Sequence, residues 1–314
     1  MNVVALAGGV GGAKLAYGLA QILQPEELTV IVNTGDDFEH LGLHISPDLD
    51  TVMYTLAGVA NPETGWGLAG ETWNFLDALG RLGGATWFRL GDRDLATHVE
   101  RSHRLWSGQS LTEVTAALCT SLGVRPRLLP MTDDIVSTIV RTDEGELEFQ
   151  EYFVHRQCRP RVRGFRFHGL EHAFPTEAVL AALDAAEAIL FCPSNPFVSL
   201  DPILNLPGIR ERVRRTGAVA VSPIVGGQAL KGPAAKMFAE LGWEASALAV
   251  AEHYAGLLRG FVLDTVDAGL KEKVESETVK VLVTNTVMKT DSDRARLARE
   301  VLAFAIGDKI SHMR

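Results

Sequence analysis

Residues 1–20 read MNVVALAGGVGGAKLAYGLA, and this stretch decides the fold. The apolar run at residues 3–6 is typical of a short buried strand, and residues 15–20 favour a helix. Between them lies a glycine-rich loop, GGVGGAK, at residues 8–14. A strand, a glycine loop and a helix in this order can bind phosphate, because glycine lets backbone N–H groups approach an anion at the positive end of a helix. We therefore predict a phosphate site that uses Gly9, Gly11, Gly12 and Lys14; the alternative is a tight turn that only packs.

The loop differs from the two common phosphate-binding fingerprints. Lys14 is followed by Leu15 rather than by Ser or Thr, so the P-loop pattern is absent. The glycine spacing also departs from the first, third and sixth positions of the dinucleotide fingerprint. The class of ligand must therefore be inferred from the rest of the chain.

Composition narrows the class of protein. The 314 residues are 46% hydrophobic and 22% charged, as in an ordinary globular protein. A net charge of −9 argues against a nucleic-acid partner bound through a broad basic surface. Three cysteines without a C-x-x-C motif fit a reducing cytoplasm, and no apolar run approaches the length of a membrane span. We expect a soluble cytoplasmic protein that binds small molecules and neither membrane nor nucleic acid.

The order of apolar segments predicts the fold class. Residues 28–32 form a second apolar strand, so one strand–helix–strand unit fits within about thirty-five residues and predicts a parallel sheet. Apolar runs at residues 188–191 and 218–221 continue the alternation. We predict one α/β domain over residues 1–314, with a Rossmann-like, mostly parallel sheet and helices on both faces. A helical and β-hairpin subdomain, inserted at about residues 60–170, would cover the substrate site. Within it we expect a short strand at 87–90 and a hairpin of residues 135–141 and 147–154.

Acidic residues gather where strands are expected to end. The segment SPDLDT at residues 46–51 reads as the start of a helix, with Asp48 and Asp50 in its first turn. Two residues apart, they do not share a helical face, but at a loop–helix junction they can converge on a cation. Asp36 and Asp37 are predicted on the same rim of the sheet. Mg²⁺ usually binds one or two carboxylates plus phosphate oxygens, so we predict a Mg²⁺ site at Asp48 and Asp50. The alternative is that both acids only stabilise the helix dipole.

Two groups of arginines are further candidates. Arg89 and Arg93 flank a polar loop and can hold a negative ligand group or form surface salt bridges. Arg159, Arg161 and Arg163 alternate, so in an extended strand they point to one side. Such a stripe suits a phosphorylated ligand, an acidic partner or a charged edge strand, and these alternatives stay open.

Several motifs together carry a family resemblance. They are GGVGGAKL at residues 8–15, VNTGDD at 32–37, SPDLDTVMYTL at 46–56, GDRDLA at 91–96 and PSNP at 193–196. The chain resembles the 2-phospho-L-lactate transferase (CofD) family of coenzyme F-420 biosynthesis, whose bacterial branch contains phosphoenolpyruvate transferases. A wider group with the same loop acts in cell-wall regulation without transferase activity, and the motifs at 46–51 and 91–94 favour the transferase branch.

The resemblance implies a phosphotransferase reaction. A hydroxyl of 7,8-didemethyl-8-hydroxy-5-deazariboflavin would attack the phosphorus attached to lactate or enolpyruvate in a guanosine diphosphate-linked donor, GMP would leave, and F-420 without glutamate, or its dehydro form, would result. No residue of the sequence decides whether the donor carries lactate, enolpyruvate or glycerate. Mg²⁺ and a homodimer are expected. The competing hypothesis is a non-catalytic regulator on the same fold that binds a nucleotide or sugar nucleotide; an NAD-dependent dehydrogenase is more remote.

The resemblance also implies residue roles. The glycine loop and Lys14 would hold the diphosphate. Asp48 and Asp50 would bind Mg²⁺ or orient the hydroxyl. Asp50 and Arg89 would contact the deazaflavin, and Ser194 and Asn195 would contact the guanosine end of the donor.

Overall fold

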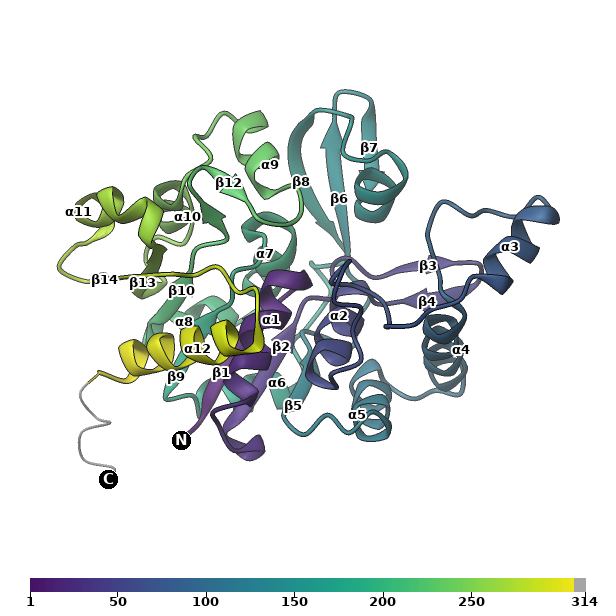
Figure 1. The fold of residues 1–314 in the computed structure, drawn as a ribbon, viewed down its shortest axis with the longest axis horizontal. Helices are drawn as coiled ribbons and strands as arrows, with labels where there is room; N and C mark the ends of the chain where they lie inside the picture. Colours follow the sequence, from purple (N-terminus) through teal and green to yellow (C-terminus); the bar gives the residue numbers. More distant parts are fainter. Residues whose placement is uncertain (308–314) are drawn as a thin grey trace.

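The computed structural model describes residues 1–307, and its centre is a seven-stranded parallel sheet (Figure 1). The strand order across this sheet is β14-β13-β10-β9-β1-β2-β5. The strands are β1 (Val3–Ala7), β2 (Leu28–Val32), β5 (Arg127–Pro130), β9 (Ala188–Phe191), β10 (Ala218–Val221), β13 (Leu258–Asp264) and β14 (Lys280–Thr284). The predicted Rossmann-like fold class is confirmed.

Strand β1 lies inside the sheet, at the point where the order of the strands changes direction. From β1 the chain moves outward through β2 to β5, and it then returns to pair β9 against the other side of β1. All five residues of β1 are buried, because both of its edges and both of its faces are covered. Ligands of open α/β sheets bind at such a switch point, beyond the carboxyl ends of the strands.

Helices cover both faces of the sheet, as predicted. The apolar residues of one face pack with α1 (Gly9–Ala20), α2 (Pro47–Leu56), α5 (Leu111–Ser121) and α12 (Asp291–Ile306). Those of the other face pack with α6 (Glu177–Asp184), α8 (Ile209–Thr216), α9 (Ala234–Glu240) and α10 (Ala247–His253). A Cβ at Gly18 would collide with the carbonyl of Arg294, so glycine allows α1 and α12 to approach closely.

Smaller elements project from the sheet. The hairpin of β3 (Phe38–His40) and β4 (Leu43–Ile45), with α3 (Asn74–Arg81) and α4 (Asp92–Trp106), extends to the right in Figure 1. A three-stranded sheet, β7-β6-β8, rises at the top of the view. Its strands are β6 (Ser137–Thr142), β7 (Gly145–Glu148) and β8 (Val162–His168). Further short elements are α7 (Asp201–Leu204), β11 (Ile224–Val225), β12 (Gln228–Ala229), α11 (Lys271–Val274) and the 3-10 helices η1 (Pro25–Glu27) and η4 (Thr265–Leu270).

The structure corrects several local predictions. Residues 87–90 form no strand, since Trp87 and Phe88 pack in an aromatic cluster with Phe38 instead of pairing with another strand. The predicted second hairpin strand ends at Glu148, because the chain then turns into the π-helix η2 (Glu151–His155) and buries Tyr152. Arg159 and Arg161 precede β8, so the three arginines do not share one strand. The segment expected to be an insertion is divided by β5, which joins the main sheet at its edge.

Within residues 1–307, no helix combines the length and the apolarity needed to cross a membrane. Cys119, Cys158 and Cys192 are free thiols.

Candidate functional site at the carboxyl ends of the central strands

The glycine loop meets the loop that follows β9 at the switch point. The backbone N–H of Gly8 donates to Ser194 Oγ at 3.0 Å, and this hydroxyl donates to the Gly8 carbonyl at 2.8 Å. Helix α1 begins at Gly9, so the glycines themselves form its first turn. We call residues 8–12, Asp48 and Ser194 the glycine cradle.

Glycine is required in the cradle by close packing. A Cβ on Gly12 would lie 2.6 Å from Ser194 Oγ, and one on Gly11 would collide with the carbonyl of Pro193. Gly9 has a φ of +60°, which side chains rarely adopt. Three of the first four residues of α1 therefore carry no side chain, which leaves backbone accessible at the helix N-terminus, as anion binding requires.

Asp48 lies in the cradle and is held by Asn33. Asn33 Nδ2 donates to Asp48 Oδ2 at 3.0 Å and to the carbonyl of Val198 at 3.1 Å. Burial raises the pKa of Asp48 to about 6, although the hydrogen bonds from Asn33 and from the backbone of Gly9 favour the carboxylate. Burial, and then repulsion from Asp48 and Asp37, raises the pKa of Asp36 well above its usual range. The carboxyl groups of Asp36 and Asp37 thus lie close enough to that of Asp48 in the cradle to repel it or one another.

Asp50 has different neighbours from Asp48, although both belong to the first turn of α2. Arg101 Nη1 donates to Asp50 Oδ2 at 3.0 Å, and Arg101 Nη2 donates to the other carboxylate oxygen. Arg101 is 1% exposed and Asp50 is 5% exposed. Burial lowers the pKa of Arg101, but the charge and hydrogen bonds of Asp50, together with Tyr54 and Asp37, outweigh it, so the pKa is raised. The structure therefore does not bring the carboxylates of Asp48 and Asp50 onto one point.

The other predicted site residues each have a partner within the fold. Lys14 is half-buried and its Nζ donates to the carbonyl of Met288 at 3.0 Å; burial and then Arg294 and Lys231 lower its pKa. Asn195 Oδ1 accepts from the N–H of Phe197 at 3.0 Å, capping the short π-helix η3 (Pro196–Leu200). The exposed Arg89 places its guanidinium carbon 4.2 Å from the ring centroid of Trp73.

Sequence reasoning overlooked Asn33 and Arg101 as side chains that hold the two aspartates. Asn33 belongs to the quoted VNTGDD motif, but nothing local shows that its amide reaches Asp48. For Arg101 a signal exists, because Asp94, His98 and Arg101 recur at helical spacing on a predicted helix.

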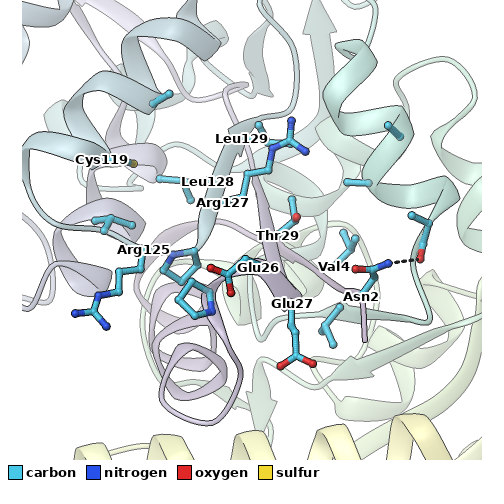
Figure 2. Close-up of a pocket in the computed structure, with 18 of the residues that line it drawn as sticks. Asn2, Val4, Glu26, Glu27, Thr29, Cys119, Arg125, Arg127, Leu128 and Leu129 are labelled. Atoms are coloured by element: carbon cyan, nitrogen blue, oxygen red, sulfur yellow. Dashed lines mark hydrogen bonds between the residues drawn. The ribbon is translucent and has the colours of Figure 1, made fainter.

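A groove in the described residues lies elsewhere on the sheet. It has a volume of about 610 Å³ and lies at the amino ends of β1, β2 and β5, where Figure 2 shows Asn2, Glu27 and Arg127 around it. The cradle lies at the opposite, carboxyl ends of these strands, so this groove does not belong to the candidate site.

Relatives of known name cover nearly the whole chain. A phosphoenolpyruvate transferase of Streptomyces griseus is 45% identical over 97% of this chain and 98% of its own length. A 2-phospho-L-lactate transferase of Methanothermobacter thermautotrophicus is 38% identical over 96% of this chain and 97% of its own. A crystal structure of a UPF0052-family protein from Bacillus halodurans has a TM-score of 0.60 at 14% identity, covering 96% of this chain and 98% of that one, and it shares the fold.

The family model described as 2-phospho-L-lactate transferase CofD matches residues 3–304. The glycine cradle and the aspartates of α2 both lie within this match. The chain therefore belongs to the 2-phospho-L-lactate transferase (CofD) family of transferase enzymes.

Proposed function

We propose that this enzyme transfers a phospholactyl or enolpyruvyl-phospho group from a guanosine diphosphate-linked donor to 7,8-didemethyl-8-hydroxy-5-deazariboflavin. The hydroxyl oxygen of the deazaflavin attacks the phosphorus that carries the acyl group. The bond from this phosphorus to the bridging oxygen breaks, and GMP leaves with that oxygen. The hydroxyl proton is released, and the product is F-420 without glutamate or its dehydro form.

The observation that carries this proposal is the start of α2. Its first turn places Asp48 in the glycine cradle, and two residues later it places Asp50 against Arg101. A diphosphate in the cradle would therefore lie next to a second, separately held carboxylate. This arrangement suits a reaction between two substrates, because one helix fixes the distance between their binding groups.

The residues of this chain would act mainly by positioning and by balancing charge. The N–H groups at the start of α1 face the diphosphate, whose negative charge the helix N-terminus favours. Ser194 and Asn195 lie at the adjoining loop and would receive the guanosine end. Asp50 accepts a hydrogen bond from the attacking hydroxyl, and Arg89 contacts the deazaflavin once it leaves Trp73. Phosphoryl transfer needs little more than such positioning and electrostatic stabilisation.

The carboxylates beside the cradle fit a Mg²⁺ ion. Asp36 Oδ1 is buried without a hydrogen-bond partner among the described residues. Burial, and then repulsion from Asp48, raises the pKa of Asp36, and burial together with repulsion from Asp37 raises that of Asp48. Oxygen ligands of this kind suit Mg²⁺, which needs only one or two carboxylates beside phosphate oxygens and water. When bound, the ion would neutralise charge on the diphosphate. We propose Asp48 and Asp36 as its ligands; Asp50, also predicted as a ligand, directs its carboxylate to Arg101 instead.

One assay tests the proposed reaction. The protein is mixed with Mg²⁺, the deazaflavin and either the lactyl or the enolpyruvyl donor, and both GMP and the coupled product are identified by mass. We expect product and GMP in equal amounts with at least one donor. Nucleotide binding without coupling to either donor would favour the regulator hypothesis instead. The homodimer and the cytoplasmic location remain predictions, and light scattering on the purified protein tests the first.

A further inference from the structure

A buried polar seam joins α2 to α4 beside the candidate site. On α4, Asp94, His98 and Arg101 follow one another at helical spacing, and on α2 the facing residues are Asp50 and Tyr54. All five residues are buried, with at most 9% of their surface exposed. Nothing in the packing of two helices requires this, since apolar side chains would fill the same space without the cost of removing charges from water.

The contacts in the seam converge on Asp50. Both terminal nitrogens of Arg101 donate to the Asp50 carboxylate, and His98 Nδ1 lies 3.2 Å from Arg101 Nη1 and 3.7 Å from Asp50 Oδ2. Behind them, His98 Nε2 lies 3.4 Å from Asp94 Oδ1, which accepts from the hydroxyl of Tyr54 at 2.7 Å. The guanidinium is planar and binds through two parallel hydrogen bonds, so it fixes the plane of the carboxylate as well as its position.

Helix α4 is itself anchored at its start. Glu71 accepts from the backbone N–H of Arg93 at 2.9 Å and from that of Asp94 at 2.7 Å. A Cβ on Gly91 would collide with the carboxylate of Glu71, so this contact depends on glycine at the helix start. The start of the helix that carries Arg101 is therefore held against the loop that contains Glu71.

We infer that Arg101, oriented by His98, is a positioning residue that fixes the Asp50 carboxylate for the hydroxyl of the acceptor substrate. This inference rests on the proposed function. A carboxylate has about four lone-pair directions, and the two bonds from Arg101 leave others free to accept from a hydroxyl. Arg101 is buried behind Asp50, so it acts through Asp50.

The decisive variants are Arg101→Met and Arg101→Lys. The first removes both the positive charge and the two hydrogen bonds to Asp50, whereas the second keeps the charge but cannot bind both carboxylate oxygens through a planar group. Arg104→Met is the matched control, because Arg104 lies on the same helix but pairs with the half-exposed Glu100. The readouts are kcat and KM for the deazaflavin, Kd for the deazaflavin from its fluorescence, Kd for GDP by calorimetry, and the melting temperature.

We expect Arg101→Met to lower kcat/KM for the deazaflavin about 100-fold, the size of loss that a misplacement of about 1 Å can cause. Kd for GDP should stay within twofold, Arg101→Lys should recover part of the activity, and Arg104→Met should match the wild type. In a double-mutant cycle on the deazaflavin Kd, Arg101→Met should add little to Asp50→Asn, because both remove one interaction.

Wild-type kcat/KM in Arg101→Met, or full additivity in the cycle, would overturn the inference. If Arg101→Met does not fold, Arg101→Lys decides: we expect at least a tenfold loss with GDP affinity unchanged, and wild-type kcat/KM would refute the positioning role. A wild-type enzyme that never couples the deazaflavin refutes the proposed function, and the inference falls with it. Unchanged Arg101 variants of an active enzyme refute only the inference.

Discussion

The Asp48 carboxylate occupies the space that a side chain on Gly8 would need. An ideal Cβ on Gly8 would collide with Asp48 Oδ2 and would lie 2.7 Å from the Cβ of Ser199. Gly8 has a φ of −159°, which any residue adopts, so a substitution there acts through crowding alone.

We therefore predict that Gly8→Ala displaces Asp48 and lowers kcat by at least about tenfold, since small displacements of reacting groups are costly. Steady-state kinetics and the Mg²⁺ dependence of the rate measure this effect. Gly269→Ala is the control, because a Cβ there meets nothing within 4 Å. Equal rates in the two variants would mean that Asp48 has room to move without loss.

Ser194 ties the β9 loop to the glycine cradle. Its buried hydroxyl makes two hydrogen bonds to the backbone of Gly8, so Ser194→Ala leaves an N–H and a carbonyl without this partner. We expect a loss of about 1–3 kcal/mol in the free energy of unfolding and weaker GDP binding. Ser246→Ala removes the N-cap of α10, and it should lower stability by about 1 kcal/mol without changing GDP affinity. Thermal denaturation measures the stability of the two variants, and calorimetry measures their affinity for GDP. Unchanged GDP affinity in Ser194→Ala would show that the loop after β9 does not contribute to nucleotide binding.

The raised pKa of Asp48 has a consequence for stability. The folded protein holds a proton on Asp48 up to a pH of about 6, whereas an ordinary aspartate releases it near 3.8. Between these values the folded state binds more protons than the unfolded state, so the contribution of Asp48 to stability is lost as the pH rises through this window. Asp48→Asn should therefore raise the melting temperature of the protein in EDTA at pH 7.5. The rise should be larger at pH 7.5 than at pH 4. The same variant should abolish turnover. A lower melting temperature at pH 7.5 would show that the ionised carboxylate stabilises the fold.

We predict that Lys14 binds the diphosphate together with the glycine cradle. Its ammonium is held by the Met288 carbonyl, with Arg294 and Lys231 near enough to lower its pKa. If Lys14 moves to a bound diphosphate, Lys14→Met should weaken GDP binding about tenfold or more, the value of a charge-assisted hydrogen bond. It should also reduce the dependence of Kd on salt. Lys289→Met is the control, because it removes a positive charge close to the same segment. Equal GDP affinity in the two variants would mean that Lys14 does not bind the diphosphate and only holds the segment before α12 through Met288.

The sequence predicted the sheet and the cradle because both rest on local patterns. Continuous apolar runs identified β1 and β9, and the glycines revealed where an anion can approach. Pairings between distant segments were not predictable, because the spacing within α2 does not show that Arg101, 51 residues later, binds Asp50. The sequence did not reveal strand β5, because it has only four residues, follows Pro126 and itself ends in Pro130. At residues 87–90 the sequence predicted a strand that the structure does not contain. Aromatic side chains favour strands, but they can equally pack in a cluster outside any strand.

The hydrogen bonds between Gly8 and Ser194 span 186 positions of the chain. During synthesis Gly8 leaves the ribosome long before Ser194 does, so these bonds cannot form on the emerging chain. The glycine cradle is completed only after β9 has emerged and paired with β1. The loop that begins the fold is therefore among the last parts of it to reach its final structure.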